Sequence, residues 1–346
     1  MAIRKMQPIE GFLIESNDGV IFDVKGLAHP PGKIIAFPRF IPDQKGFRTR
    51  KGVKYIKVYG FSERFAFLES AIPNYVVHDP VFDEKLCEVP LENVKKVYSP
   101  IEGLRRLRRE GESGKLDGLE RAALQCLTLL REKANVPWDS LGVSGSVLVG
   151  LHTLASDIDP VVYGVENCRK VHLALKKMLE EGNTPFKPYN LEDLRKLFAF
   201  RSKDTFMNFE DFVKVESRKV FQGKFMDRDY FIRFVKDYSE VGEKYGDVHY
   251  RNCGHARIEA VVVDDSEAIF TPCTYKIEKV RIVEGPELQP IREIASFRGR
   301  FCEQARRGET VVAQGKIEHV ADQRSGQEYF RLLLGNKPTD YMILKH

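Results

Sequence analysis

The chain has 346 residues, of which 42% are hydrophobic and 30% are charged, a balance typical of folded globular proteins. This composition excludes a disordered or fibrous protein, and no stretch approaches the roughly 18 consecutive apolar residues that a membrane-spanning helix needs. The net charge of +5 is small and matters only where basic residues cluster. The N-terminus has no signal-like apolar core, so we expect a cytoplasmic protein without a membrane partner.

Short β-branched or aromatic runs, bounded by turn residues, begin the chain. Runs of this kind cover 19–24, 33–37 and 53–59, and they predict a β-rich N-terminal domain over residues 1–98. The six cysteines lie far apart without a CxxC pair, so we expect reduced thiols and no disulfide framework.

A basic segment with interleaved aromatic residues, 45–57, lies inside this first domain and contains no acidic residue. Such a segment suits a nucleic-acid backbone with stacking bases, and it is equally typical of a solvated hairpin. Its candidate nucleic-acid contacts are Lys45, Arg48, Arg50, Lys51 and Lys54.

The sequence becomes helical beyond Pro100, with apolar residues at spacings of three and four. This periodicity predicts helices over 116–134, 165–181 and 190–200. Strand-like runs return at 230–235, 256–263 and 268–280. We therefore expect a mixed α+β domain over residues 99–284, which includes a helical linker.

The last 62 residues resume β character after Gly285-Pro286. Runs over 297–301, 310–317 and 329–334 are separated by arginine- and glycine-containing turns. They predict a small OB-like β-barrel over residues 285–346. Arg298 and Arg300 add a second candidate surface for nucleic acid.

Residues 145–159 contain the most informative pattern. Asp157 and Asp159 are two residues apart, so a strand would present both carboxylates on one face, where their oxygens could hold a divalent cation. Gly145 and Ser146 follow a short apolar strand and precede a helix-like run, 147–154, so backbone amides and a hydroxyl could bind phosphate there. The sequence predicts a phosphate site beside a metal site.

Two-metal sites usually require a third carboxylate. Glu259 is the best candidate because it lies within an otherwise apolar strand, where an unpaired charge would be costly. It could bind a metal, or it could pair with an arginine such as Arg257 or Arg233.

The Gly-Ser pair, Gly150 and the later Ser156-Asp157-Ile158-Asp159 resemble the nucleotidyltransferase superfamily of DNA polymerase beta. The resemblance covers roughly residues 135–280, and the flanking segments also resemble an uncharacterised archaeal group of predicted nucleotidyltransferases. It implies a polymerase-beta-like central domain with a mixed sheet. In that reading Gly145, Ser146, Gly150 and Ser156 bind the nucleotide, while Asp157, Asp159 and Glu259 are the catalytic and Mg²⁺ (or Mn²⁺) ligands.

The resemblance implies transfer of an NMP from an NTP to an acceptor hydroxyl with release of pyrophosphate, and the flanking basic β domains favour RNA as acceptor. One departure is Val149, because many members of the superfamily have a basic residue there that helps to hold the triphosphate. Lys170, Arg233 or Arg257 could take that role instead. Two alternatives stay open: a non-catalytic nucleic-acid-binding protein on a retired transferase fold, and an enzyme that nucleotidylates a protein or small molecule.

Two histidine-containing segments have simpler interpretations. The run 249–255 holds two His and one Cys, but its spacing matches no zinc site, so we interpret it as a loop or turn. His29 lies in a rigid Pro-Gly turn and is a weak candidate for a ligand contact.

Overall fold

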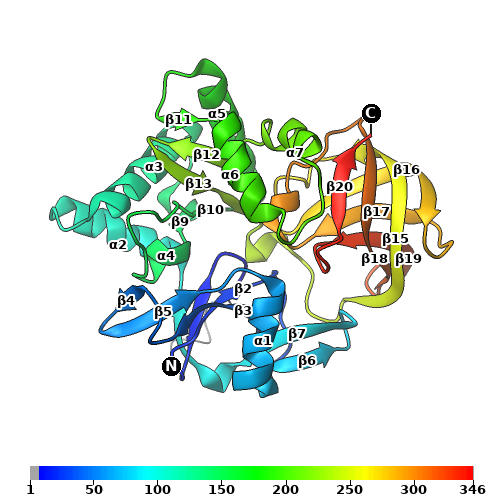
Figure 1. Cartoon of the computed structure of the whole chain (residues 1–346), viewed down its shortest axis with the longest axis horizontal. Coiled ribbons are helices and arrows are strands. Elements are labelled where there is room, and N and C mark those ends of the chain that lie inside the picture. The colour runs from blue at the N-terminus through cyan, green and yellow to red at the C-terminus, as the bar shows by residue number, and fades with distance from the viewer. Residues whose placement is uncertain (1–7, 346) are drawn as a thin grey trace. The chain divides into compact units, whose positions relative to one another are not determined.

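The computed structural model describes residues 8–345, and the chain divides into two compact units. Unit 1 comprises Met1–Val77, Lys85–Lys187 and Phe221–Gly242, and unit 2 comprises His78–Glu84, Pro188–Val220 and Glu243–His346. The fold is mixed α+β with several sheets, as predicted (Figure 1). Neither predicted boundary, after residue 98 or after residue 284, coincides with a boundary between these units.

The first part of unit 1 is an antiparallel sheet in the order β4-β5-β3-β2-β1-β8, with β7 pairing both β3 and β6. This confirms the β-rich character predicted for the N-terminal region. Helix α1 (Phe61–Ala71) packs on β3. The strands are β1 (Leu13–Ser16), β2 (Ile21–Val24), β3 (Lys33–Pro42), β4 (Arg48–Arg50), β5 (Val53–Lys57), β6 (Val76–Asp79), β7 (Glu84–Pro90) and β8 (Val94–Tyr98).

The second part of unit 1 has a three-stranded sheet in the order β14-β10-β9, flanked by helices. Strand β10 (Pro160–Tyr163) runs antiparallel to β9 (Leu141–Val143) and parallel to β14 (Arg233–Val235). Three helices pack here: α2 (Pro100–Glu112), α3 (Gly118–Ala134) and α5 (Val165–Glu181). A further antiparallel sheet contains β11 (Phe186–Lys187), β12 (Gln222–Phe225) and β13 (Arg228–Phe231).

Local sequence signals explain where the main helices begin and end. Asp117 caps α3 by accepting hydrogen bonds from the amides of Leu119 and Glu120, and Asn135 ends that helix in a left-handed conformation. Helix α5 ends at Gly182, which also adopts a positive φ. The predicted helices over 116–134 and 165–181 are therefore confirmed.

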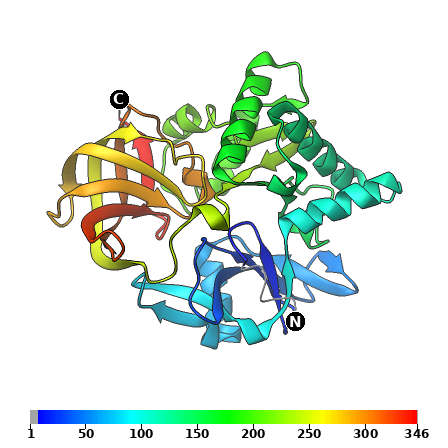
Figure 2. The same cartoon turned by 180° about the vertical axis from the view of Figure 1, so that it is seen from behind.

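Unit 2 contains a closed five-strand β-barrel, visible from both sides in Figures 1 and 2. Strand β15 pairs with both β16 and β18, and the closure runs through an antiparallel β16–β17 pair and a parallel β17–β19 pair. The barrel strands are β15 (Val248–Asp264), β16 (Cys273–Glu284), β17 (Ile291–Ser296), β18 (Thr310–Asp322) and β19 (Gln327–Leu334). Strand β20 (Tyr341–Leu344) pairs antiparallel with the first part of β18. Unit 2 also contains the helices α6 (Leu191–Arg201) and α7 (Phe209–Glu216).

The barrel is larger than the predicted tail domain. Runs 256–263 and 268–280 were expected in the central domain, but they lie in β15 and β16, the first two barrel strands. Their partners include β18, about 60 residues later, in a register from Val248↔Asp322 to Val261↔Thr310. Pairing at that separation leaves no local signal, so the sequence did not indicate that these runs pair with the tail.

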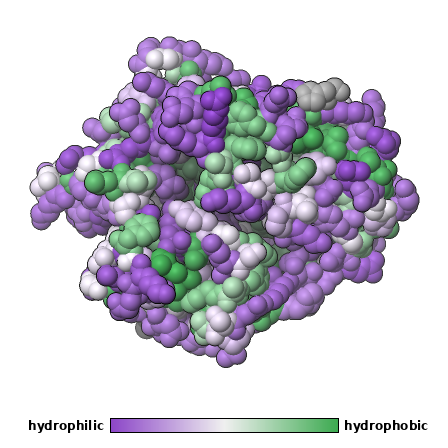
Figure 3. Space-filling model, in the orientation of Figure 1, coloured by the Kyte–Doolittle hydropathy of each residue, from purple (hydrophilic) through white to green (hydrophobic). Residues whose placement is uncertain are grey.

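One face of the molecule is mostly polar. Figure 3 shows a face covered mainly by hydrophilic residues, with smaller apolar areas between them. None of the described helices is long and apolar enough to cross a lipid bilayer. All six cysteines are free thiols, as expected.

His29 is a core residue of unit 1. Its Nε2 lies 2.7 Å from the Pro8 carbonyl oxygen, and its Nδ1 accepts a hydrogen bond of 3.2 Å from the Ile35 amide. Burial lowers the pKa of the imidazole to about 4, against the hydrogen bond to Pro8, which acts in the opposite direction. Both ring nitrogens therefore make hydrogen bonds with the backbone. Neither nitrogen is left for a ligand, so the ligand contact suggested for His29 does not fit the structure.

Acid should destabilise the protein through His29. Because the pKa is lower in the folded state than the usual value of about 6.5, the stabilisation is full above that value and is lost as the pH falls toward 4. We expect His29 to account for about 2 kcal/mol of lost unfolding free energy between pH 7.5 and pH 5. Urea unfolding of wild type and His29→Gln at both pH values measures it; equal pH dependence in the two proteins would contradict the assignment.

Candidate active site

The Gly-Ser motif lies in the turn that follows β9. Ser144 donates its amide to the Asp159 carbonyl oxygen (2.8 Å) and its hydroxyl to the Gly11 carbonyl oxygen (2.6 Å). The first bond joins the motif to the aspartates that precede β10, and the second joins it to the N-terminal segment. The two halves of the predicted motif are therefore held together by the backbone.

Gly145 makes the closest approach in the site. Its φ is +61°, a left-handed conformation that favours glycine, and a Cβ built on it would overlap the Oδ2 atom of Asp159. The Asp159 carboxylate therefore packs directly on the Gly145 Cα. This contact explains why a residue without a side chain precedes Ser146.

The Ser146 hydroxyl is buried, and it makes no hydrogen bond with any residue that the structure describes. A buried hydroxyl without a partner costs free energy, since it has lost its water. Ser146 follows the glycine on which Asp159 packs, so the unused hydroxyl belongs to the same turn as that contact. This is the polar group that a phosphate oxygen could satisfy.

The helix predicted over 147–154 is wrong. Helix α4 (Gly145–Leu148) is a single turn, and Gly150 then takes a φ of +67°, which ends the helical path. Residues 151–156 form a loop instead. A single turn supplies little helix dipole, so any phosphate binding here would depend on loop amides and the Ser146 hydroxyl rather than on a helix terminus.

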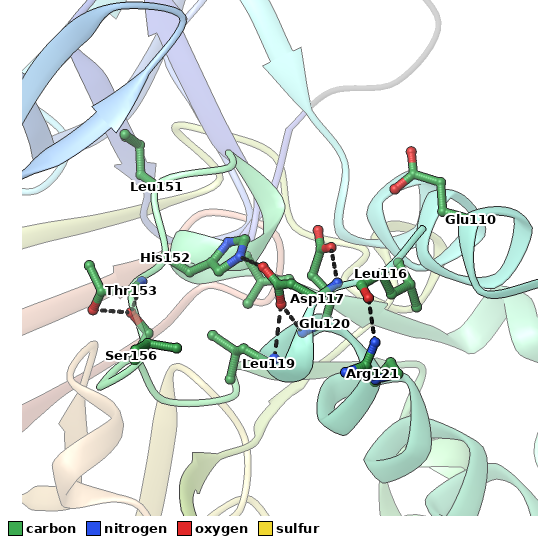
Figure 4. A network of polar contacts seen from close by, with 12 residues as sticks. Glu110, Leu116, Asp117, Leu119, Glu120, Arg121, Leu151, His152, Thr153 and Ser156 are labelled. Atoms are coloured by element: carbon green, nitrogen blue, oxygen red, sulfur yellow. Dashed lines mark hydrogen bonds and ion pairs between the residues drawn. The ribbon is translucent and has the colours of Figure 1, made fainter. Parts of the chain in front are cut away.

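Polar contacts fix this loop, as Figure 4 shows. His152 Nε2 lies 2.6 Å from Asp117 Oδ2, and the Ser156 Oγ accepts the Thr153 amide at 2.9 Å. Arg48 Nη1 also reaches Ser156 Oγ at 3.3 Å and the Leu151 carbonyl oxygen at 2.5 Å. Ser156, predicted to bind the nucleotide, is thus engaged in holding the loop.

Asp157 and Asp159 flank Ile158, whose side chain is fully buried, so the two carboxylates share the opposite face of the strand. Burial raises the pKa of Asp159 to about 6, and the charge of Asp157 acts in the same direction. Lys57, Arg233 and Arg39 oppose this shift. A cation between the carboxylates would relieve the same repulsion.

Arg233 has other acidic partners. Its Nη1 lies 3.0 Å from Glu10 Oε1 and 3.1 Å from Asp23 Oδ1. Although burial works against the charged carboxylate, Arg233 and Lys25 hold the pKa of Asp23 well below its usual range. Arg233 is thus committed to a buried ion-pair cluster.

Asp229 is a third acid on this face that sequence reasoning missed. A parallel bridge pairs Ile158 with Tyr230, so Asp229 lies beside Asp157 in register and its side chain takes the same face as both aspartates. Asp229 is exposed and forms an ion pair of 2.8 Å with Lys224. The signal in the sequence that could have indicated Asp229 is its position directly before the strand-like run 230–235.

Glu259, the predicted third acid, lies on β15 in unit 2, whereas both aspartates belong to unit 1. Its carboxylate accepts hydrogen bonds from Arg281 and Lys345. These ion pairs lower the pKa of Glu259. The structure therefore matches the ion-pair alternative, although with different partners from Arg257 or Arg233.

The basic segment 45–57 has two kinds of side chain. Arg48 is buried against the motif loop, and Arg50 donates to Glu15 Oε2 (2.8 Å) and to the Tyr98 hydroxyl (2.7 Å), so both arginines are structural. Lys45, Lys51 and Lys54 are exposed. Only the lysines remain candidates for nucleic-acid contact in this hairpin.

The candidate contacts in unit 2 are also internal. Arg298 Nη2 lies 2.6 Å from Asp204 Oδ2, and Arg300 pairs with the same carboxylate. Both predicted contact arginines of the tail are therefore held by one internal carboxylate, that of Asp204. The segment 249–255 was predicted to be a loop or turn, but it lies in strand β15 and pairs with β18, so that prediction is wrong. Its His255 Nε2 lies 2.8 Å from Asp340 Oδ1, consistent with a structural role.

No cluster of three or more His, Cys, Asp or Glu side chains suitable for a metal occurs among residues 8–345. This does not conflict with a Mg²⁺ site, because Mg²⁺ is commonly held by one or two carboxylates together with waters and substrate phosphates. The donor set of Asp157 and Asp159 beside an unpartnered hydroxyl fits that mode of binding.

Comparison with known proteins gives one relative of nearly equal length. The chain is 34% identical over 330 residues to the uncharacterized protein MJ1086 of Methanocaldococcus jannaschii, covering 93% of this chain and 94% of the relative. No protein-family model matches the chain, and no solved structure matches it.

Replacing Gly145 tests the contact with Asp159. Gly145→Ala combines the left-handed strain with the overlap on the carboxylate, whereas Gly150→Ala has a similar φ of +67° but nothing within 4 Å of the new Cβ. We expect Gly150→Ala to lower the unfolding free energy by about 1–2 kcal/mol and Gly145→Ala by at least about 3 kcal/mol. Urea unfolding measures both, and equal losses would mean that the contact imposes no constraint.

Proposed function

We propose that this chain, which belongs to the same family as MJ1086 of Methanocaldococcus jannaschii, is a metal-dependent nucleotidyltransferase. It would move an NMP from an NTP to an acceptor hydroxyl and release pyrophosphate. The observation that carries the proposal is the buried, unpartnered Ser146 hydroxyl in the turn where Asp159 packs on Gly145. A hydroxyl that could accept a phosphate contact and a carboxylate that could bind a cation thus both lie at this turn, which supports the proposal.

Each residue of the motif has a distinct part in the proposed reaction. The Ser146 hydroxyl and neighbouring amides would hold phosphate oxygens of the NTP, while Asp157 and Asp159 would hold Mg²⁺ or Mn²⁺. Bound there, the metal would neutralise charge that develops on the phosphoryl oxygens during transfer. The acceptor oxygen forms a bond to the α-phosphorus as the bond from the α-phosphorus to the bridging oxygen breaks.

We propose Asp229 as a third carboxylate that acts on the acceptor hydroxyl and not as a metal ligand, because no group of three acids that could hold a metal occurs among residues 8–345. It shares a strand face with Asp157 and Asp159, and it belongs to the same compact unit. As an exposed carboxylate, it can accept the proton that the acceptor hydroxyl releases. Glu259 is left with a structural role because two cations already bind its carboxylate.

RNA is the proposed acceptor, and the support comes from the β4–β5 hairpin. Its exposed lysines, Lys45, Lys51 and Lys54, accompany Phe47, whose side chain is 76% exposed. Exposed aromatic and basic residues together suit a single strand, since bases stack on the ring while the ammonium groups face phosphates. The hairpin is joined to the motif loop through Arg48.

Transfer should depend on the acids of unit 1 and not on Glu259. With NTPs radiolabelled at the α-phosphate, Mg²⁺ and total RNA, we expect Asp157→Asn together with Asp159→Asn to lower label transfer by at least about 100-fold. Asp229→Asn should also lower it, whereas Glu259→Gln should retain wild-type transfer. Gel analysis of labelled RNA gives the measurement.

Three results would count against the proposal. Transfer that persists in the double aspartate variant would remove the proposed metal site. A large loss in Glu259→Gln with full activity in Asp229→Asn would reverse the assignment of the third carboxylate. Label recovered on protein instead of RNA would make a protein the acceptor.

The hairpin lysines should contribute to RNA affinity through phosphate contacts. Replacing Lys45, Lys51 and Lys54 together by Ala should weaken binding of single-stranded RNA and reduce the slope of log affinity against log salt by about 2. A control replaces three other exposed lysines, Lys133, Lys177 and Lys196. Filter binding at several salt concentrations measures the slopes, and identical slopes for hairpin and control variants would contradict a hairpin surface.

A further inference from the structure

The position before Gly150 cannot supply a base for the nucleotide. Val149 is buried in a hydrophobic cluster that also contains Phe40 and Tyr55 of the N-terminal sheet. The three bases considered as replacements are engaged elsewhere. Arg233 pairs with Glu10 and Asp23, Lys170 pairs with Glu166 at 2.6 Å, and Arg257 pairs with Glu284 at 3.2 Å in unit 2.

Through this cluster, Val149 instead packs against the N-terminal sheet, and that sheet carries two other basic residues. Lys57 on β5 is paired in register with Phe40, and the following Val58 donates its amide to the Arg39 carbonyl oxygen, so Arg39 and Lys57 are neighbours across β3 and β5. Tyr59 lies between them: its ring centroid is 4.6 Å from Arg39 Cζ and 4.8 Å from Lys57 Nζ. The ring holds both cations in place.

Both bases lie near the aspartates. Lys57 Nζ is 3.8 Å from Asp157 Oδ1, and the charges of Lys57 and Arg39 both act on Asp159. The register of β3 and β5 therefore brings positive charge from the N-terminal sheet to the motif that contains Gly145 and Ser146.

Lys57 has one long ion pair with an acid, and neither base donates a hydrogen bond to a carboxylate among the described residues. The separation of 3.8 Å between Lys57 and Asp157 is too long for a hydrogen bond, although the Lys57 side chain is only 5% exposed. Arg39 makes one hydrogen bond, of 3.4 Å, to the Val58 carbonyl oxygen, and no carboxylate lies within ion-pair distance of it in the described part of the chain. Two cations thus retain donors that an incoming anion could use.

We propose that Lys57 and Arg39 bind the β- and γ-phosphates of the NTP, in place of the base that is missing at Val149. This inference rests on the proposed nucleotidyltransferase function. It assigns the N-terminal β sheet a direct part in substrate binding. A buried ammonium group with unused donors gains most from an anion, because charge-assisted hydrogen bonds are strong where water is excluded.

Binding of triphosphate and monophosphate nucleotides by the full chain tests this assignment. Titration calorimetry with Mg²⁺ would compare the α,β-methylene analogues of ATP, GTP, CTP and UTP with the corresponding NMPs. We expect Lys57→Met and Arg39→Gln each to lower triphosphate affinity by about 10- to 100-fold and to change NMP affinity little. Lys57→Arg should restore the preference for triphosphate.

Lys95→Met is the matched control, because Lys95 Nζ also lies 3.8 Å from a carboxylate, that of Glu15, and belongs to the same sheet. It should bind as wild type does. If wild type prefers triphosphate and both variants keep that preference, the assignment of Lys57 and Arg39 is overturned while the proposed function stands. An equal loss of triphosphate and NMP affinity also overturns it, since it indicates a structural role.

Two further results separate the remaining cases. If wild type binds none of the four analogues, the proposed function fails and this inference fails with it. If Lys57→Met does not fold, as judged by thermal unfolding, Arg39→Gln decides by itself.

Discussion

The contact between the Gly145 Cα and the Asp159 carboxylate is the constraint on which the rest of the site depends. It requires a glycine with a positive φ, and it fixes the carboxylate against the turn that carries Ser146. Ser144 reinforces it with a hydrogen bond to the Asp159 backbone. The residues proposed to bind phosphate and metal therefore belong to one turn and its direct contact rather than to two neighbouring sites.

Charged side chains of both signs surround this contact. Two are aspartates, one of them buried, and three are the bases Arg39, Lys57 and Arg233, whose charges act on Asp159. Arg233 is neutralised by Glu10 and Asp23, whereas Arg39 and Lys57 are not closely paired. A divalent cation could pair with the two aspartates, and an anion could pair with Arg39 and Lys57. A metal-bound nucleoside triphosphate has that combination of charges.

Local patterns predicted much of the fold. Helices α3 and α5 agree with their apolar periodicity, and the β character of the N-terminal region follows from its alternating turns and apolar runs. The motif of Gly145, Ser146, Asp157 and Asp159 was visible because its residues are close in sequence. The sequence did not indicate the proposed roles of Asp229 and Lys57, since a parallel bridge and a sheet register bring these residues to the motif from about 70 and 100 residues away.

Glu259 shows the opposite error. An acid in an apolar strand is costly only if it is buried, and Glu259 lies on the partly exposed face of β15, between the buried Ile258 and Ala260. Its partners are Arg281 on β16 and Lys345, which follows β20, and pairing at these separations leaves no local signal. Similarly, Arg48 and Arg50 belong to a basic run, and only tertiary structure shows that both are used to hold the protein together.

The division of the chain into two interleaved units has a consequence for how such a protein can change over time. The chain passes from one unit to the other five times, after residues 77, 84, 187, 220 and 242. A gene fusion or deletion that adds or removes one continuous segment cannot exchange either unit as a whole. The barrel and the unit that contains Gly145 and Asp159 must therefore be inherited together, and any change of binding specificity has to arise by substitution within surfaces that already exist.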